Sequence, residues 1–525
     1  MLRLLGYVAL LVLILMAGSA YVVLECRCDL PSVAHAPFLP PSDPKASLVK
    51  QAKTPEEWAA LTRQDLMEVR RQLERNTPIP YDTENPAYGR WLLKGYEEAL
   101  QRAAQVDSFS GYYFTLAAYM NGFRDLHLAF GLVGEPPPGR WPGFIVSLEG
   151  DHAEIVFRDE ADAAVPALGS KVISCDGKSV RELAREKIFP FRHIEVIPSH
   201  VRLAVSRLFL DRFNPFAPAI QSCEIETAGT RQTLALQWRA LPADEDKWFE
   251  HFSEASNGPG TEWGVREVEP GVWWIGVPTF SSGDDTAPLL KTLMEEVEKK
   301  GAQMREARAI VIDTRGNGGG NSAWADRLAK AAFTPEVLAK HPAPERSTAT
   351  DWRASKENGV YWYEWAVQME KEFGAWSFNR LSVLFLGRQL TKFAESDPPL
   401  YRIPTCWPSK SGGLTKMRPT GESPFRAKVY VLSNGSCGSS CLNFADTVLM
   451  VPGVKLIGAA TSADGVYMDV RSVDLPSGLG SVTFAQKVER GGGRAALEYY
   501  EADVAYDGAW SDAAVRAWVM GVVKQ

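Results

Sequence analysis

The chain has 525 residues, which is too long for one compact core and predicts about two to four domains. Its hydrophobic content of 45% and charged content of 23% are typical of a globular protein and exclude a wholly disordered chain. A net charge of −7 gives no electrostatic footprint for nucleic acid, so no nucleic-acid partner is expected.

The first 24 residues are almost wholly apolar, with Arg3 as the only charge. This stretch can be a signal peptide with its apolar core at 4–16, cleaved after the small residues "AGSA". It can equally be an uncleaved anchor, because it is about long enough to span a bilayer. We therefore interpret residues 1–28 as a signal peptide or membrane anchor and the Pro-rich residues 29–46 as a linker. Both interpretations predict an exported protein of the periplasm or cell envelope, held by an N-terminal membrane anchor in the second case.

The cysteines are compatible with an oxidising compartment. There are seven, at positions 26, 28, 175, 223, 406, 437 and 441, so one thiol remains if the others pair. Cys437 and Cys441 could pair with each other, with a distant cysteine, or not at all. No histidine has ligand spacing to this pair, so a zinc site is not expected, and the sequence implies no other metal or cofactor.

After the linker, residues 47–135 read as an N-terminal helical domain. The first helix is expected to begin after the cap Thr54, with Glu57 completing a capping box. Further helical patterns follow at 87–106 and 110–123.

Residues 136–240 change character to short alternating runs broken by Gly and Asp-Gly turns, which predicts a β-rich domain. From about residue 262 to the end, strands alternate with helices. That pattern predicts an α/β sheet with functional groups at the C-terminal ends of its strands. One helix is expected at 287–301, with Leu289 facing inward and Gly301 as its stop. The aromatic-rich residues 335–425 read as a helical insertion that could cover a site.

The stretch "DTRGNGGG" at 313–320 places a glycine turn directly after a buried strand. Such a turn exposes backbone N–H groups that can bind an oxyanion, although it can also be only a tight strand–helix connection. It is not a phosphate loop, because no Lys-Ser/Thr pair follows the glycines.

The stretch "SNGSCGSSCLNFAD" at 433–446 lies between a second strand and a helix. Ser439 comes just before the helix, where the helix dipole favours a developing anion, and the N–H of Ser440 could point into the same site. Ser433 and Ser436 lie further back along the turn. The alternative is that the small residues only cap the helix.

Together with "PGVKLIGAATS" at 452–462, these two stretches occur in an order that resembles the C-terminal processing (tail-specific) peptidases. Their superfamily includes the tricorn core protease and the modules of interphotoreceptor retinoid-binding protein. The resemblance covers roughly 262–525 and implies an α/β catalytic domain of crotonase-like (ClpP-like) ββα type with serine peptidase activity. Upstream, 136–240 resembles a PDZ domain, in which Gly143 and Phe144 would belong to the loop that binds a peptide carboxylate.

The residue that would act as the general base differs from the one in the tail-specific branch. That branch uses a serine–lysine dyad, but Asp464 stands where the lysine should be. The tricorn-like and retinoid-binding-like branches take a histidine from an Asp-x-His stretch, which corresponds here to Asp125, Leu126 and His127.

The resemblance therefore implies catalytic roles for several residues. Ser439 would be the nucleophile and His127 the base, with N–H groups of Gly318, Gly319 and Ser440 as the oxyanion hole. Glu501 or Glu498 would orient the histidine, with Asp125 as the local alternative.

The expected function is an exported serine peptidase that hydrolyses peptide bonds in unfolded proteins or oligopeptides through a Ser-His acyl-enzyme mechanism. The alternative is a catalytically inactive ligand- or peptide-binding protein on the same fold, and a third possibility is a scaffold that acts through the PDZ-like groove. The sequence leaves the oligomeric state open.

Overall fold

The computed structural model describes residues 51–150, 152–343, 348–404, 418–491, 494–508 and 510–525. The expected export segment, the linker, and Cys26, Cys28 and Cys406 lie outside the described residues. Within the described ranges, no helix is both long and apolar enough to cross a membrane.

From residue 51 on, the described N-terminal part forms three α-helices, as the sequence predicts. They are α2 (Pro55–Asn76), α3 (Pro86–Ala103) and α4 (Phe109–Asn121). The predicted capping box is present, because the Thr54 side chain accepts the Glu57 N–H while the Glu57 side chain accepts the Thr54 N–H.

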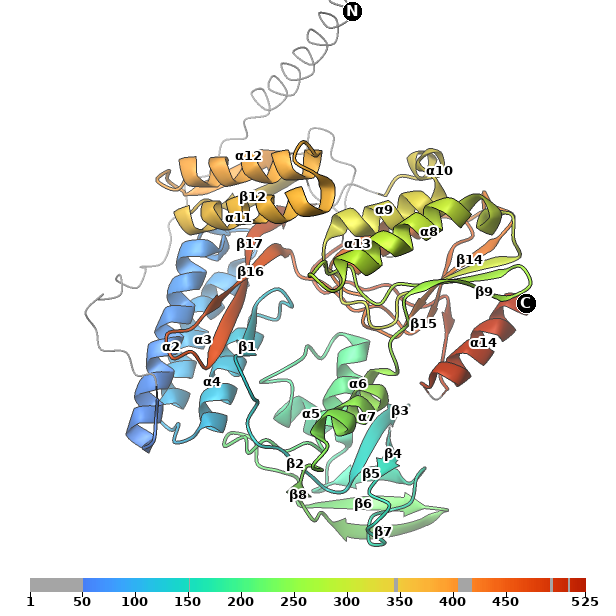
Figure 1. Ribbon diagram of the computed structural model, residues 1–525. Coiled ribbons are helices and arrows are strands. Elements are labelled where there is room, and N and C mark those ends of the chain that lie inside the picture. The colour runs from blue at the N-terminus through green and yellow to red at the C-terminus, as the bar shows by residue number, and fades with distance from the viewer. Residues whose placement is uncertain (1–50, 151, 344–347, 405–417, 492–493, 509) are drawn as a thin grey trace, which may run out of the picture.

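These helices share their core with a sheet built from distant parts of the chain (Figure 1). Its strands are β1 (Ala129–Leu132), β12 (Ala349–Arg353), β13 (Leu400–Pro404), β16 (Tyr467–Asp474) and β17 (Gly480–Arg490). The order is β1-β17-β12-β13, with β16 also paired to β17. The helical unit, the insertion and the late part of the chain, which look separate in sequence, are thus interleaved in one structural unit.

The β-rich region is a five-stranded antiparallel meander in the order β3-β4-β5-β6-β7. Its strands are β3 (Phe144–Glu149), β4 (His152–Arg158), β5 (Lys171–Cys175), β6 (Ser222–Thr227) and β7 (Thr230–Ala235). Helices α5 (Val180–Lys187), α6 (Pro198–Arg207) and α7 (Glu245–Asn257) accompany it, and the short strands β2 (Arg140–Trp141) and β8 (Arg239–Ala240) pair beside it. A disulfide joins Cys175 of β5 to Cys223 of β6.

The third region is the predicted α/β sheet, six strands in the order β18-β15-β14-β11-β10-β9. Its strands are β9 (Gly264–Glu269), β10 (Val272–Gly276), β11 (Ala309–Asp313), β14 (Lys428–Ser433), β15 (Lys455–Gly458) and β18 (Val504–Ala505). The pairs from β10 to β18 are parallel. Helices α8 (Ala287–Arg305), α9 (Ser322–Phe333) and α13 (Ser440–Val448) cover one face, and α14 (Asp512–Lys524) covers the other.

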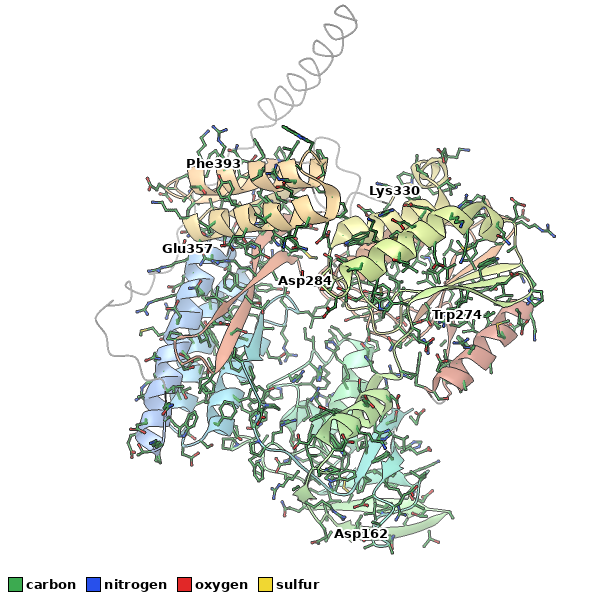
Figure 2. All side chains as sticks on the ribbon, in the orientation of Figure 1. Asp162, Trp274, Asp284, Lys330, Glu357 and Phe393 are labelled. Carbon is green, nitrogen blue, oxygen red and sulfur yellow. A yellow bond between two sulfur atoms is a disulfide. The ribbon has the colours of Figure 1, made fainter. Side chains whose placement is uncertain are left out.

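Side chains fill both sides of this sheet, and Trp274 lies in the core layer shared with α14 (Figure 2). Strands β11 and β14 are parallel neighbours, with Asp313 opposite Leu432. Because the carboxyl ends of parallel strands meet at one edge, the turn 313–320 and the turn 433–439 lie side by side.

Two details of the predicted helix at 287–301 are wrong. Leu289 does not face inward but is exposed, and α8 continues past Gly301 to Arg305. A Cβ at Gly301 would come within 2.9 Å of the Ala331 carbonyl oxygen, so the glycine permits close packing of α8 rather than ending it.

Within its described residues, the predicted insertion contains three helices, α10 (Pro335–Lys340), α11 (Lys356–Phe373) and α12 (Phe378–Lys392). It also contributes β12 and β13 to the sheet that backs the N-terminal helices, which the aromatic, helical composition did not indicate.

Candidate active site

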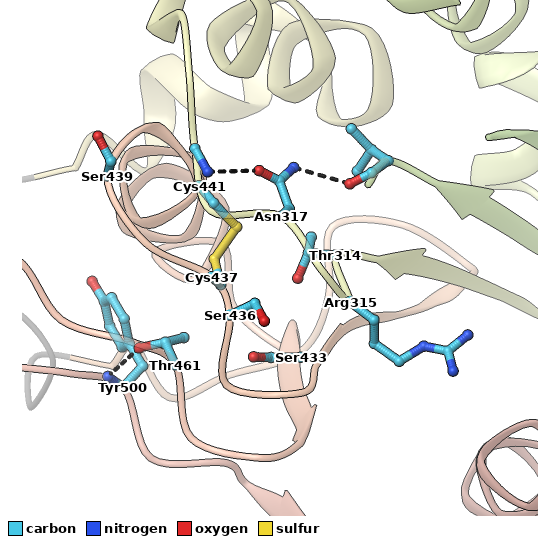
Figure 3. Close-up of a disulfide and its surroundings, with 12 residues drawn as sticks. Thr314, Arg315, Asn317, Ser433, Ser436, Cys437, Ser439, Cys441, Thr461 and Tyr500 are labelled. Atoms are coloured by element: carbon cyan, nitrogen blue, oxygen red, sulfur yellow. Dashed lines mark hydrogen bonds between the residues drawn. A yellow bond between two sulfur atoms is a disulfide. The ribbon is translucent and has the colours of Figure 1, made fainter. Parts of the chain in front are cut away.

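Ser439 lies at the point where the turn after β14 enters α13. Its backbone has φ 49° and ψ −122°, a conformation that costs a non-glycine residue about 1–3 kcal/mol and persists only when the surroundings enforce it. A disulfide between Cys437 and Cys441 closes the chain around it, and the Ser439 hydroxyl points away from the sulfur atoms (Figure 3). The turn from β11 packs against it so closely that a Cβ on Gly319 would come within 2.7 Å of the Ser439 Cβ.

His127 is brought to this serine from the loop between α4 and β1. Its Nε2 atom lies 3.4 Å from Ser439 Oγ, although the two residues are 312 positions apart in sequence. This is slightly longer than the 2.6–3.2 Å of a working proton transfer, a looseness that is common in sites without substrate. The structure thus brings together the two residues that the resemblance pairs.

Asp125 is the carboxylate beside His127. Its Oδ1 atom accepts the backbone N–H of His127 at 2.9 Å and lies 3.7 Å from His127 Nδ1, and its Oδ2 accepts the Tyr88 hydroxyl at 3.0 Å. Burial raises the pKa of Asp125, and the neighbouring His127 opposes that shift. Gly465 makes room for it, since a Cβ there would come within 1.7 Å of Asp125 Oδ2.

The two late glutamates lie elsewhere. Glu501 is exposed and interacts with the hydroxyl of Tyr499, whose pKa is raised by burial and by this carboxylate. The Glu498 carboxylate accepts the backbone N–H of Ala495 at 2.7 Å. Of the three carboxylates suggested by the sequence, the structure places Asp125 next to His127.

The glycine turn after β11 has few N–H groups left for an oxyanion. Gly316 donates to Asn434 Oδ1 at 3.2 Å, and Gly319 donates to Asn317 Oδ1 at 2.9 Å. Gly318 is exposed and is not part of the cleft wall, whereas Gly320 and Ser440 both line the cleft beside Ser439.

The backbone N–H groups of Ser440 and Gly320 have no hydrogen bond within the described chain. The Ser440 hydroxyl also donates to the Gly320 carbonyl at 2.6 Å, which ties the two turns together. The structure therefore brings Ser440 and Gly320 to the serine, while Gly318 and Gly319 are not placed to serve there.

A cleft of about 910 Å³ opens in front of Ser439 and His127. One wall is the loop that follows β10, at 281–283, together with the glycine turn. Aromatic and apolar side chains line another part of the cleft and come from α11, with Tyr361, Trp362 and Trp365, and from β16, with Met468 and Val470. The charged side chains of Asp469, Lys487 and Glu489 lie among them. The insertion therefore lines the site, and a cleft of this size can hold several side chains of an extended peptide.

Sequence reasoning missed two residues around this site. Tyr88 holds Asp125, and Arg494 lies between Asp446 and Asp464 at 3.3 and 3.2 Å. Neither residue belongs to a recognisable motif, so only their position in the folded chain reveals them.

The predicted carboxylate-binding loop at Gly143 and Phe144 is closed. Phe144 is buried with its ring 5.3 Å from that of Phe209, and a side chain on Gly143 would collide with Val165 and Arg239. The edge of β3 is also covered, because Ser206 Oγ on α6 donates to the Val146 carbonyl at 2.8 Å. The structure does not bring either residue to an open groove.

Among the described residues, no group of three or more His, Cys, Asp or Glu side chains is arranged to hold a metal ion.

Comparison with known proteins identifies the family. Residues 272–505 match peptidase family S41. The fold is similar to the crystal structure of mature CPAF, with 15% identity, a TM-score of 0.56, and coverage of 85% of this chain and 92% of that chain. It is also similar to mature CPAF complexed with lactacystin, with 14% identity, a TM-score of 0.52, and coverage of 83% and 94%. No curated protein sequence matches the chain. The motifs around Ser439 and the match over the α/β sheet lead to one conclusion: residues 272–505 form a region of peptidase family S41, a family of serine peptidases.

Proposed function

We propose that the chain hydrolyses peptide bonds with Ser439 as the nucleophile and His127 as the general base. The observation that carries this proposal is the 3.4 Å approach of His127 Nε2 to Ser439 Oγ across 312 residues of sequence, at the wall of a large cleft. A serine in a strained turn beside a histidine is the arrangement that nucleophilic acyl transfer requires.

The reaction follows from the geometry. Ser439 Oγ attacks the peptide carbonyl carbon while its proton passes to His127 Nε2. The N–H groups of Ser440 and Gly320 receive the oxyanion, and each such donor is worth about 3–4 kcal/mol in known enzymes. The tetrahedral intermediate collapses as His127 returns the proton to the leaving amine, and water then releases the acyl group by the reverse sequence.

Asp125 serves as the orienting carboxylate in this proposal. His127 Nδ1 is buried and has no hydrogen-bond partner within the described chain, and Asp125 Oδ1 lies 3.7 Å away. A small rotation of the imidazole closes this gap. The carboxylate then holds the tautomer with the proton on Nδ1 and stabilises the imidazolium that forms during attack.

The substrates we propose are unfolded proteins or oligopeptides. The nucleophile lies inside a cleft that aromatic and charged side chains line together, so a scissile bond would enter on an extended segment of a chain that is not folded. The proposal does not assign substrate capture to the closed loop at Gly143.

We further propose that the protein works outside the cytoplasm. Two disulfides lie within the described residues, and one of them surrounds the nucleophile. Disulfides persist mainly in oxidising compartments, which agrees with the apolar residues 1–24 acting as a signal peptide or anchor.

The proposal is tested by hydrolysis of an unfolded protein such as denatured casein. Ser439→Ala is expected to lose at least about 10⁴-fold in rate. Ser436→Ala is the matched control, since its hydroxyl lies in the same turn but accepts the Asn257 amide N–H at 2.7 Å. Wild-type hydrolysis by Ser439→Ala would exclude this nucleophile. A wild-type protein that binds peptides without cleaving them would support the inactive binding protein instead.

A further inference from the structure

Asp464 stands where the tail-specific peptidases carry a lysine, and it is in direct contact with the nucleophile. Its side chain is buried, with 4% of the residue exposed. Its Oδ1 atom accepts the backbone N–H of Ser439 at 3.0 Å. A carboxylate at this point cannot replace the lysine as a base, because it contacts the main chain of Ser439 rather than its hydroxyl.

The bond from the Ser439 N–H to Asp464 is one of two hydrogen bonds that restrain the peptide bond between Gly438 and Ser439. The carbonyl of Gly438 accepts the N–H of Cys441 at 2.9 Å, while the N–H of Ser439, on the other side of the same peptide bond, donates to Asp464. With both ends held, the peptide plane that precedes Ser439 cannot rotate, and φ of Ser439 stays at 49°. That conformation directs the hydroxyl toward His127.

Asp464 is itself held in place by a chain of polar contacts. Its Oδ2 atom pairs with Arg494 at 3.2 Å, and Arg494 also pairs with Asp446 at 3.3 Å. Asp446 in turn accepts the Tyr500 hydroxyl at 2.9 Å, and the backbone carbonyl of Asp464 accepts the N–H of Leu497 at 2.7 Å. The carboxylate is therefore a fixed acceptor with a defined direction.

We propose that Asp464 is a positioning residue for catalysis: its carboxylate holds the backbone of Ser439 in the strained conformation from which the hydroxyl can react. The position that supplies a proton acceptor in the lysine-dependent branch here supplies a support for the nucleophile. This inference rests on the proposed function, since it assigns to Asp464 an effect on the reactivity of Ser439. The competing view is that Asp464 only forms a buried ion pair that stabilises the fold.

Two substitutions separate these views. Asp464→Asn keeps an oxygen that can accept the Ser439 N–H but removes the charge that pairs with Arg494. Asp464→Leu has a similar size and no acceptor. The readouts are the rate at which a fluorophosphonate labels Ser439, and kcat and KM for a peptide substrate.

Asp464→Leu is expected to lower the labelling rate and kcat by about 100-fold with little change in KM, because a displaced nucleophile affects chemistry more than binding. Asp464→Asn is expected to stay within about fivefold of the wild type in both rates. Asp351→Asn is the matched control, since Asp351 is a buried carboxylate between Arg402 and Arg490 that does not line the cleft. It should lower thermal stability and leave the labelling rate unchanged.

The outcomes are distinct. Wild-type labelling of Asp464→Leu would overturn the inference, as would equal losses in the Asn and Leu variants, which would assign the effect to the ion pair with Arg494. If Asp464→Leu does not fold, Asp464→Ala takes its place. The inference would also be overturned if Asp464→Ala does not fold while Asp464→Asn folds but is labelled slowly. Absence of labelling in the wild type would instead reject the proposed function itself.

Discussion

Two loops of small residues adjoin strand ends in this chain, and only one of them is open. The turn at 433–439 leads from β14 into a cleft, with a strained serine at its end. Beside this serine, the N–H groups of Ser440 and of Gly320 from the neighbouring turn have no hydrogen bond within the described residues. The loop before β3 also carries a glycine with positive φ, Gly143. There, however, the side chains of Val165 and Arg239 fill the space, and the adjoining strand edge is covered by α6.

The difference shows what makes such a loop a candidate site. Both loops have the small residues and the unusual backbone that suggest ligand binding. Only the turn at Ser439 lies at the wall of the cleft, where the N–H groups of Ser440 and Gly320 have no hydrogen bond within the described chain. The comparison therefore predicts that changes at the open turn affect rate, whereas changes at the closed loop affect stability.

The largest effect is expected at the base. His127→Gln cannot take the proton of Ser439, so kcat for peptide hydrolysis should fall by about 10⁴-fold, with thermal stability close to that of the wild type. Steady-state kinetics and thermal unfolding measure the two quantities. His341→Gln, at the end of α10, is the control and should keep full activity. Retained hydrolysis by His127→Gln would show that another group is the base.

Asp125→Asn should have the next largest effect, a loss of about 100-fold or more in kcat, because the amide does not stabilise the imidazolium. The same substitution should lower kcat but raise the free energy of unfolding at neutral pH. Burial raises the pKa of Asp125 above 3.8, so the protonated form is favoured in the fold, and this contribution to stability is lost as pH rises through the folded pKa. Asp125→Asn should therefore be as stable as the wild type at pH 3 and relatively more stable at pH 7 in urea titrations. A variant that loses stability at pH 7 but keeps its kcat would make Asp125 structural only.

In the β-rich region, His200 of α6 should make the free energy of unfolding depend on pH. Burial lowers the pKa of His200 from 6.5 to about 4, and its Nδ1 atom accepts the N–H of Ile194 at 3.0 Å. A lowered folded pKa means that the stabilising contribution is complete above pH 6.5 and is lost as pH falls toward 4, a loss of about 3 kcal/mol. His200→Asn keeps an acceptor for Ile194 and should remove that part of the pH dependence. An unchanged slope between pH 7 and 4 in the variant would contradict this.

The smallest effect is expected at the covered edge of β3. Ser206→Ala removes the hydroxyl that donates to the Val146 carbonyl and should lower the free energy of unfolding by about 1 kcal/mol without changing kcat. Fluorescence polarisation with peptides that end in a free carboxylate should show no binding to either protein. Specific binding of such a peptide to the wild type would mean that the loop opens, and the contrast between the two loops would fail.

Much of the catalytic region could be predicted from the sequence. The alternation of strands and helices predicts a parallel sheet, and parallel neighbours bring the turns at 313–320 and 433–439 to one edge. The helix start distinguishes Ser439 from Ser433 and Ser436. His127 could be suggested only through resemblance, because no local pattern links residues that are 312 positions apart.

The remainder depends on contacts that sequence patterns do not encode. The Asn317 side chain takes the Gly319 N–H, and Gly318 is not part of the cleft wall, so Gly320 is the glycine left beside the serine. Glu501 resembled an orienting carboxylate by its place late in the chain, yet it is exposed beside Tyr499. The sheet that joins β1, β12 and β17 could not be foreseen either, because the three strands lie far apart in sequence.

The most direct test of the central claim is to treat the wild-type protein with a fluorophosphonate and locate the adduct by mass spectrometry. One stoichiometric adduct on Ser439 is expected, and its formation should be nearly abolished in His127→Gln. An adduct on another serine, or labelling of Ser439 at the same rate in His127→Gln, would contradict that claim.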